Sequence, residues 1–403
     1  VKPGEAWARL LPVLSGSLLV LAPPLYRRWI GSSIWARRAS LILAFGLALD
    51  PALVALSRQA GSGMPALALL FLALGLGVSR RWRLAGITAG LALLAGPAFW
   101  QGLLGLVLTW AVISLVQLSG LASSKPEDPS LVVEGEPAAT SALASARTFS
   151  IYLAGTILLL GTLFLRVPQG LAAFAGALPA YLQSWIPGSD LLPVPALRLP
   201  VALLVTQPVV VLFAILFILR AWRNREAHAP LNLGQKLTLW AALAVFVALL
   251  NPNRQVSDGV WTLIPLWALA ALELASLVPG EGERADLPII VTHAAITTLF
   301  SVLFFYNFLR LYTLGAQPWL YAAVLAGIVL MILVISLIIA AGWSPGVARL
   351  GFFWGFTLVL GFTMFSNLWY AGFAAPSHPG DLWGRPPAAG QVTELMQTLG
   401  DIS

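Results

Sequence analysis

The chain is 403 residues long, and 59% of its residues are hydrophobic while only 10% are charged. Soluble domains carry about 25% charged residues, so this composition excludes an ordinary water-soluble protein. The absence of cysteine excludes disulfides, thiolate metal sites and thiol nucleophiles, and the net charge of +7 comes from basic residues at the ends of hydrophobic runs, a pattern that favours a topology signal over binding to nucleic acid.

Hydrophobic runs of membrane-crossing length follow one another along the chain. Because backbone groups in hydrocarbon must be hydrogen-bonded within their own segment, these runs predict helices. The sequence therefore predicts an all-α polytopic membrane protein with about 12 transmembrane helices, within a range of about 10 to 13. Proline interrupts several runs, at Pro23, Pro51 and Pro97, so some helices are expected to be bent. The predicted helices are residues 9–26, 41–57, 64–78, 84–99, 102–118, 149–165, 199–219, 237–250, 260–278, 288–309, 318–342 and 347–372.

Most lysine and arginine residues fall on alternate connections between these helices. The positive-inside rule predicts that these connections are cytoplasmic and that both termini face outward, in what we expect to be the plasma membrane of a prokaryote. The cytoplasmic set is Arg27, Arg28, Arg37, Arg38, Arg80, Arg81, Arg83, Lys125, Arg147, Arg220, Arg223, Arg225, Lys236, Arg284 and Arg349.

Residues 1–372 are predicted to form one transmembrane domain with two long connections. Residues 119–147 are polar, with Gly, Pro and four carboxylates, which indicates a cytoplasmic linker with little intrinsic order. Residues 166–200 are moderately hydrophobic and contain Tyr181 and Trp185, which indicates a helix lying in the outer membrane interface. Residues 373–403 are expected to face outward and to begin a further domain.

Four segments resemble, in order, a family of membrane glycosyltransferases. They are WARLLPVLSGSLLVLAPPLYRRW (Trp7–Trp29), LALDPALVALSRQA (Leu47–Ala60), SRRWRLAGITAGLALLAGP (Ser79–Pro97) and NPNRQVSDGVWTLIPLWALAALEL (Asn251–Leu274). The family is the GT-C superfamily, in particular the bacterial relatives of dolichyl-phosphate-mannose protein mannosyltransferases. The resemblance implies a hexosyltransferase that takes its sugar from a polyprenyl-phosphate donor at the outer membrane face.

The sequence departs from that family at its acidic catalytic motif. Family members carry this motif in the first outer loop, after a first helix, whereas Glu5 is the one carboxylate near the corresponding place here. The resemblance therefore implies that a first helix and a catalytic base would precede Val1.

The remaining eight basic residues are predicted on the outer side: Lys2, Arg9, Arg58, Arg166, Arg198, Arg254, Arg310 and Arg385. Of these, Arg58, Arg198 and Arg254 are the candidates for binding a phosphate. A lipid phosphate needs multidentate cationic donors, which arginine supplies better than lysine. We expect these arginines, with Asn251 and Asn253, to form a substrate-binding site. The alternative for each arginine is an anchor in the lipid headgroups.

Transfer of a sugar to a hydroxyl also requires a carboxylate base. The outward candidates are Glu5, Asp50, Asp190 and Asp258, and we place Glu5, Asp50 and Asp258 in the predicted catalytic set. For Asp50 the alternative is an N-cap of a short helix that begins at Pro51. The histidines are too dispersed for a metal motif, so no cofactor is firmly implied and a divalent cation is the sole candidate.

Three functions are compatible with these features. The leading one is a GT-C-like glycosyltransferase whose partners are membrane lipids and a polyprenyl-phosphate-linked sugar. The alternative is a non-catalytic structural subunit of a larger membrane complex, with protein subunits as partners, because the acidic motif is missing. A transporter comes third, since charged residues within the predicted spans are few and no repeat symmetry is visible.

Overall fold

The structure, a computed structural model, describes residues 3–31, 33–59, 61–121, 139–187, 194–223, 231–280, 282, 284–314, 318–370 and 382–383. Within these ranges the regular structure is α-helix with short 3-10 helices. The chain divides into two compact units. We call Val1–Leu272 with Leu368–Ser403 the large unit, and Glu273–Asn367 the small unit.

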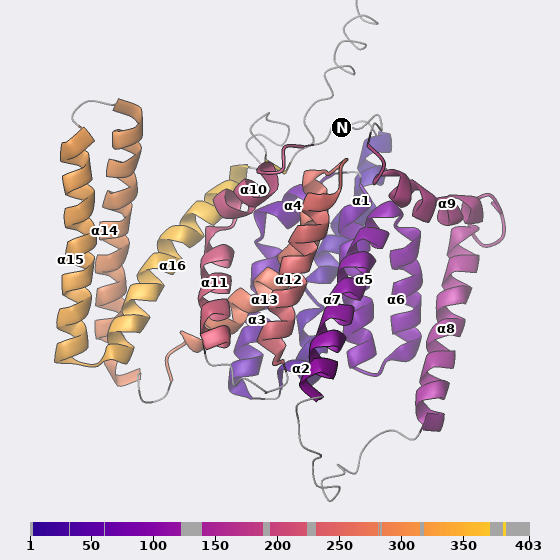
Figure 1. Cartoon of the computed structure of the whole chain (residues 1–403), viewed down its shortest axis with the longest axis horizontal. Helices are drawn as coiled ribbons and strands as arrows, with labels where there is room; N and C mark the ends of the chain where they lie inside the picture. The colour runs from indigo at the N-terminus through magenta and orange to yellow at the C-terminus, as the bar shows by residue number, and fades with distance from the viewer. Residues whose placement is uncertain are drawn as a thin grey trace, which may run out of the picture. The chain divides into compact units, whose positions relative to one another are not determined.

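The elements follow one another as helices joined by short turns (Figure 1). The first half contains α1 (Pro3–Leu19), η1 (Pro23–Tyr26), α2 (Arg27–Ile30), α3 (Ile34–Ala48), α4 (Pro51–Ser57), α5 (Gly63–Val78), α6 (Trp82–Leu94), α7 (Pro97–Leu121), α8 (Ala139–Gly161) and α9 (Gly170–Gln183). The second half contains α10 (Arg198–Thr206), α11 (Pro208–Arg223), α12 (Leu233–Leu250), η3 (Val256–Gly259), α13 (Val260–Ser276), η4 (Arg284–Asp286), α14 (Leu287–Leu314), α15 (Pro318–Gly342) and α16 (Pro345–Trp369).

The described helices confirm an all-α polytopic membrane protein. Seven are long and apolar enough to cross a membrane, and up to ten spans result if each of three bent helix pairs is one span. Ten lies at the lower end of the predicted range. Two shorter apolar helices, α5 and α6, account for the remaining predicted runs. Each predicted helix therefore has a counterpart, although several begin or end at other residues; α8, for example, begins ten residues earlier than predicted, at Ala139.

Two of the bends occur where a polar residue precedes a proline. The α3–α4 pair bends by 50° at Asp50, and the α10–α11 pair bends by 98° at Gln207. Proline disfavours the helical conformation of the residue before it, and Asp50 and Gln207 both leave the helical region there. The run 199–219, predicted as one helix, is therefore two.

Helix α13 is the most buried of the candidate spans, with 78% of its window inside the structure. It packs closely against α3 and α7 because each of these presents a glycine to it. A Cβ atom added at Gly46 would overlap the Trp267 ring, and one at Gly102 would overlap the Trp261 ring. These glycines let the large indoles of α13 fill the core of the large unit.

Helix α9 is the predicted interfacial helix. It is not among the candidate membrane spans, and Figure 1 shows it running across the end of α8 rather than alongside it. The turn between them contains three consecutive non-glycine residues with positive φ, Leu163 (48°), Phe164 (58°) and Leu165 (68°). Such a conformation costs on the order of 1–2 kcal/mol per residue. The sharp turn from α8 into α9 is therefore strained.

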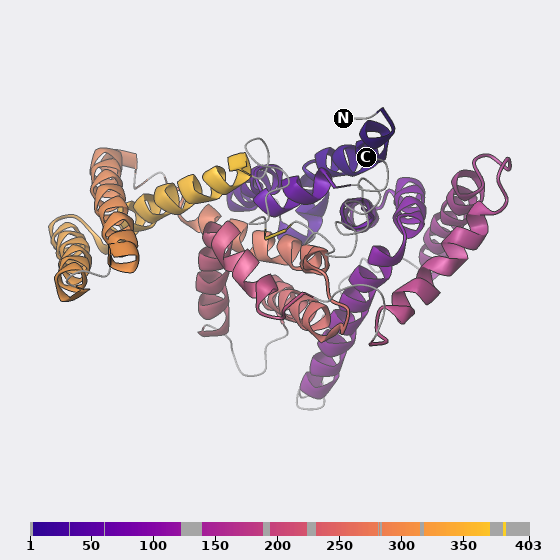
Figure 2. The same cartoon turned by 90° about the horizontal axis from the view of Figure 1, so that it is seen from above.

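The small unit consists mainly of α14, α15 and α16, which Figure 2 shows grouped together. Glycines of α16 allow close approach to α14, because Cβ atoms added at Gly351 and Gly355 would crowd His293 and Thr297. His293 is fully buried, and its Nε2 atom lies 3.1 Å from the Ser336 Oγ atom of α15. Polar side chains thus join the three helices.

Two predicted regions lie largely outside the described residues. The linker predicted at 119–147 is shorter than expected, because residues 119–121 belong to α7 and residues 139–147 to α8; residues 122–138 are not described. Of the tail 373–403, residues 382 and 383 alone are described.

Candidate functional site

Asp50 joins two of the three bent helix pairs of the large unit, α3–α4 and α10–α11. Its side chain is fully buried, and Oδ1 accepts hydrogen bonds from the Leu53 amide (2.8 Å) and from Gln207 Nε2 (3.0 Å). Oδ2 accepts one from Trp267 Nε1 (2.6 Å). Asp50 is therefore the N-cap of α4 and also ties the α3–α4 bend to the α10–α11 bend and to α13. This arrangement supports a role in joining helices, because no edge of the carboxylate faces solvent.

The loop between α12 and η3 holds the end of α9. Asn253 Nδ2 donates to the backbone oxygens of Ser184 (2.9 Å) and Ile186 (2.8 Å), just after α9. Asn251 Oδ1 accepts from the Asn253 amide at 3.0 Å, and both asparagine side chains are buried. The predicted substrate-binding asparagines thus fix the loop and attach it to α9.

Arg254 follows directly in that loop and is half-buried. Its Nη1 atom donates to the Asn251 carbonyl at 3.3 Å, and its own carbonyl accepts from the Val194 amide at 3.1 Å. Its Nε atom is buried without a hydrogen-bond partner among the described residues. A buried guanidinium N–H without an acceptor is costly, and an anionic ligand oxygen would supply that acceptor.

Asp258 lies one turn further along, in η3, and is half-buried. Its Oδ2 atom accepts a hydrogen bond from the Gln255 amide at 2.8 Å, which orients the carboxylate. Burial raises the pKa of the Tyr181 phenol in α9, and the negative charge of Asp258 raises it further. The charge of Asp258 therefore acts on Tyr181, which lies three residues before the Ser184 carbonyl that Asn253 binds.

Arg58 and Arg198 lie near a second feature, the short segment Leu382–Trp383. Arg198 Nε donates to the Leu382 carbonyl at 3.4 Å, and Gln59, the neighbour of Arg58, donates from Nε2 to the Trp383 carbonyl at 3.2 Å. The Trp383 indole is buried, and its Nε1 atom donates to Thr206 Oγ1 at 3.0 Å. This segment thus links the ends of α4 and α10.

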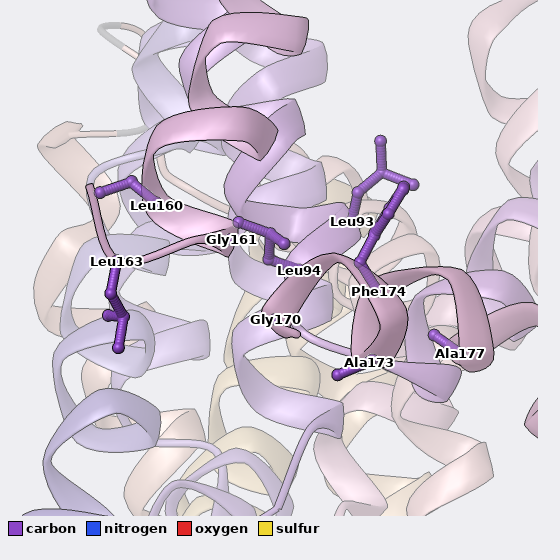
Figure 3. A pocket seen from close by; sticks show the side chains of 10 residues that line it. Leu93, Leu94, Leu160, Gly161, Leu163, Gly170, Ala173, Phe174 and Ala177 are labelled. Carbon is purple, nitrogen blue, oxygen red and sulfur yellow. The ribbon is translucent and has the colours of Figure 1, made fainter. Parts of the chain in front are cut away.

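An apolar cavity of about 440 Å³ lies at the other end of α9 (Figure 3). It is lined by helices α6, α8 and α9 and by the strained turn between α8 and α9; its larger side chains are Leu93, Leu94, Leu160, Leu163 and Phe174. Ala177 lines it from the middle of α9. Ser184, which contacts the asparagines, follows Ala177 by roughly 10 Å at the helical rise per residue. One helix therefore connects an apolar cavity with the Arg254 loop.

Comparisons with known proteins gave one similar solved structure. No protein-family model matches the chain, and no curated protein matches it by sequence. The chain is similar to ArnT. The similar structure is the crystal structure of ArnT from Cupriavidus metallidurans bound to undecaprenyl phosphate, with 17% sequence identity and a TM-score of 0.45. The match covers 93% of this chain and 65% of the ArnT chain, so this chain spans less than two thirds of the length of ArnT.

The predicted residues thus fall into three groups. Asn251, Asn253, Arg254 and Asp258 share one loop beside α9, Arg58 and Arg198 lie at the ends of α4 and α10, and Asp50 lies at the buried junction. The loop group lies near the start of α10, because the amide of Val194, four residues before Arg198, donates to the Arg254 carbonyl. Glu5 lies in α1, but its side chain is outside the described part, as is Asp190. No three carboxylate or histidine side chains gather as a metal site within the described ranges.

Gln207, Trp267 and Trp383 were not predicted as site residues from the sequence. Gln207 had a usable signal, because it precedes Pro208 inside a hydrophobic run just as Asp50 precedes Pro51. Trp267 and Trp383 had none, since a tryptophan in a membrane protein is ordinarily part of an interfacial belt or a packed core.

Proposed function

We propose that the chain is a GT-C-like glycosyltransferase that takes a sugar from a polyprenyl-phosphate donor at the outer membrane face. The observation that carries the proposal is that α9 joins an apolar cavity to the loop that holds Arg254. A polyprenyl-phosphate sugar has the same two parts, a hydrocarbon chain and an anionic phosphate. The volume of about 440 Å³ lies within the range of about 300–1,000 Å³ common for ligand sites.

In this proposal the phosphate is bound by Arg254. Its Nε atom is the buried donor that still requires an acceptor, and Nη1 is already oriented by the Asn251 carbonyl. A phosphate oxygen at Nε forms a charge-assisted hydrogen bond. Asn251 and Asn253 act as positioning residues, because they hold the loop against α9.

Asp258 is the base in this proposal. The acceptor hydroxyl oxygen attacks the anomeric carbon, and the bond from that carbon to the phosphate oxygen breaks. The bonding electrons leave on the phosphate, and the hydroxyl proton passes to the carboxylate of Asp258. Asp258 suits the role of base better than Asp50, because Asp258 is half-buried whereas the Asp50 carboxylate is fully enclosed by hydrogen-bond donors.

The test is the binding of polyprenyl phosphate to the full chain in detergent. Arg254→Ala is expected to weaken binding at least about tenfold, since a hydrogen bond to a charged group contributes about 1.5–3 kcal/mol. Arg310→Ala is the control, because Arg310 is predicted on the same face but lies over the Tyr306 ring in α14. Unchanged affinity in Arg254→Ala would remove the main support for the proposal.

A second pair of variants tests the cavity. Ala177→Phe fills the cavity and is expected to weaken binding of the long-chain polyprenyl phosphate much more than binding of a short-chain analogue. Leu178→Phe, one position along α9 and exposed, is the control. Equal effects of the two variants would mean that the chain of the lipid lies elsewhere.

A non-catalytic subunit is the second candidate. It is favoured by the fact that both described carboxylates of the predicted set, Asp50 and Asp258, cap helices. Sugar transfer separates the two candidates: transfer that is lost in Asp258→Asn while lipid binding persists supports the enzyme, and binding without any transfer by the natural chain supports the subunit.

A further inference from the structure

A concentration of arginine lies at the end of the large unit remote from α9 and α10. The turn of α2 carries Arg27 and Arg28, and the turn between α5 and α6 carries Arg80 and Arg81, followed by Arg83 in the first turn of α6. All five side chains are exposed. Figure 1 shows α2 at the opposite end of the large unit from α9 and α10.

The two turns are joined to each other by hydrogen bonds. Arg28 Nη1 donates to the Val78 carbonyl at 3.3 Å, and Ser79 Oγ donates to the Leu25 carbonyl at 2.8 Å. Gly75 of α5 allows this approach, because a Cβ atom there would crowd Leu25 and Tyr26. The arginines of both turns therefore belong to one surface, which we call the arginine corner.

The sequence around the arginine corner provides no counter-charges of its own. Residues 6–49 and 51–126 contain no aspartate or glutamate. Trp29 in α2 is 60% exposed, and Trp82 begins α6. Exposed tryptophan beside arginine is typical of the depth of lipid headgroups.

Arg80 occupies a backbone conformation that favours glycine. Its φ is +59°, and the Arg81 amide reaches back to the Leu76 carbonyl at 2.8 Å to close the end of α5. Glycine is the usual residue at the left-handed position of such a helix end. Strained backbone of this kind is common at functional sites, so the turn that carries Arg80 is a candidate ligand site.

We propose that the arginine corner binds a phospholipid that carries two phosphate groups, of the cardiolipin class, in the inner leaflet. Each turn supplies guanidinium groups for one phosphate, and guanidinium binds phosphate oxygens in bidentate fashion. Two adjacent turns therefore match a headgroup with two phosphates better than one with a single phosphate. The inference is independent of the proposed sugar transfer.

The test is native mass spectrometry of the full chain with tetraoleoyl cardiolipin or dioleoyl phosphatidylglycerol added at equal phosphate concentration. The natural chain is expected to retain cardiolipin preferentially. The triple variant Arg80→Ala, Arg81→Ala, Arg83→Ala is expected to lose cardiolipin affinity by roughly fivefold for each arginine removed. Arg27→Ala, on the other turn, is expected to reduce it by a similar single step.

The matched control removes three basic residues from another predicted cytoplasmic region, with Arg220→Ala, Arg223→Ala and Lys236→Ala. It is expected to retain cardiolipin, and a loss as large as that of the triple variant would overturn the proposal. Equal retention of both lipids by the natural chain would also overturn it. A further variant neutralises the linker carboxylates, with Glu127→Gln, Asp128→Asn, Glu134→Gln and Glu136→Gln. A large gain in cardiolipin retention by this variant would also overturn the proposal, because the linker rather than lipid would then cover the arginine corner in the natural chain.

Discussion

Asp50 connects the bent α3–α4 pair to the bent α10–α11 pair. A buried carboxylate is costly in an apolar bundle unless donors surround it, and here one amide, one carboxamide and one indole do so. The N-cap part of this environment could be predicted, because Asp-Pro at a helix start is a local signal. The pairing of Asp50 with Gln207 and Trp267 could not, since these residues lie 157 and 217 residues away along the chain.

Removing one donor from Asp50 is expected to destabilise the large unit. In Trp267→Phe a smaller aromatic ring replaces the indole, so the 2.6 Å hydrogen bond to Oδ2 is lost while the carboxylate remains buried. The expected cost is about 1–3 kcal/mol in the free energy of unfolding, measured by denaturant titration in detergent.

Trp100→Phe is the control for that measurement. The Trp100 Nε1 atom is buried without a hydrogen-bond partner among the described residues, so its removal is expected to be neutral or slightly stabilising. Equal losses in the two variants would show that the indole ring, and not its hydrogen bond, matters at position 267.

Helices α3, α7 and α13 pack closely because glycine faces tryptophan at two crossings. Gly46→Ala is expected to cost about 1–3 kcal/mol, because the new methyl group overlaps the Trp267 ring and neither helix can shift without disturbing Asp50. The loss is measured as a lower unfolding midpoint in detergent.

Gly105→Ala in α7 is the matched control for Gly46→Ala. Nothing lies within 4 Å of the added Cβ atom there, and alanine favours a helix over glycine by up to about 1 kcal/mol. It is expected to leave the midpoint unchanged or to raise it. A fall in the midpoint of Gly105→Ala as large as that of Gly46→Ala would refute the steric explanation.

The elements themselves were largely predictable from hydropathy. Residues 318–342, for example, form one uninterrupted helix with the predicted limits, because their apolar run is bounded by Pro318 and Gly342. The 98° bend at Gln207 was not predicted, since hydropathy continues across it without a break. Nor was the cavity beside α9, because it depends on how the end of α8 turns back.

The predicted orientation of the chain in the membrane can be tested directly by labelling introduced cysteines, because the chain has no cysteine of its own. Single cysteines at Gln169, before α9, and at Ser257, in η3, are expected to react with a membrane-impermeant maleimide on intact cells. A cysteine at Ser33, beside α3 and the arginine corner, is expected to react after the membrane is permeabilised. The reverse pattern would contradict the positive-inside assignment and the proposed outer site.

The most direct test of the proposed function is an electron cryomicroscopy map of the full chain with a polyprenyl phosphate. Continuous density is expected from the cavity lined by Phe174 and Ala177 along α9, ending in a phosphate at the Arg254 guanidinium. A phosphate bound on another face of the large unit, with an empty cavity and no density at Arg254, would contradict it.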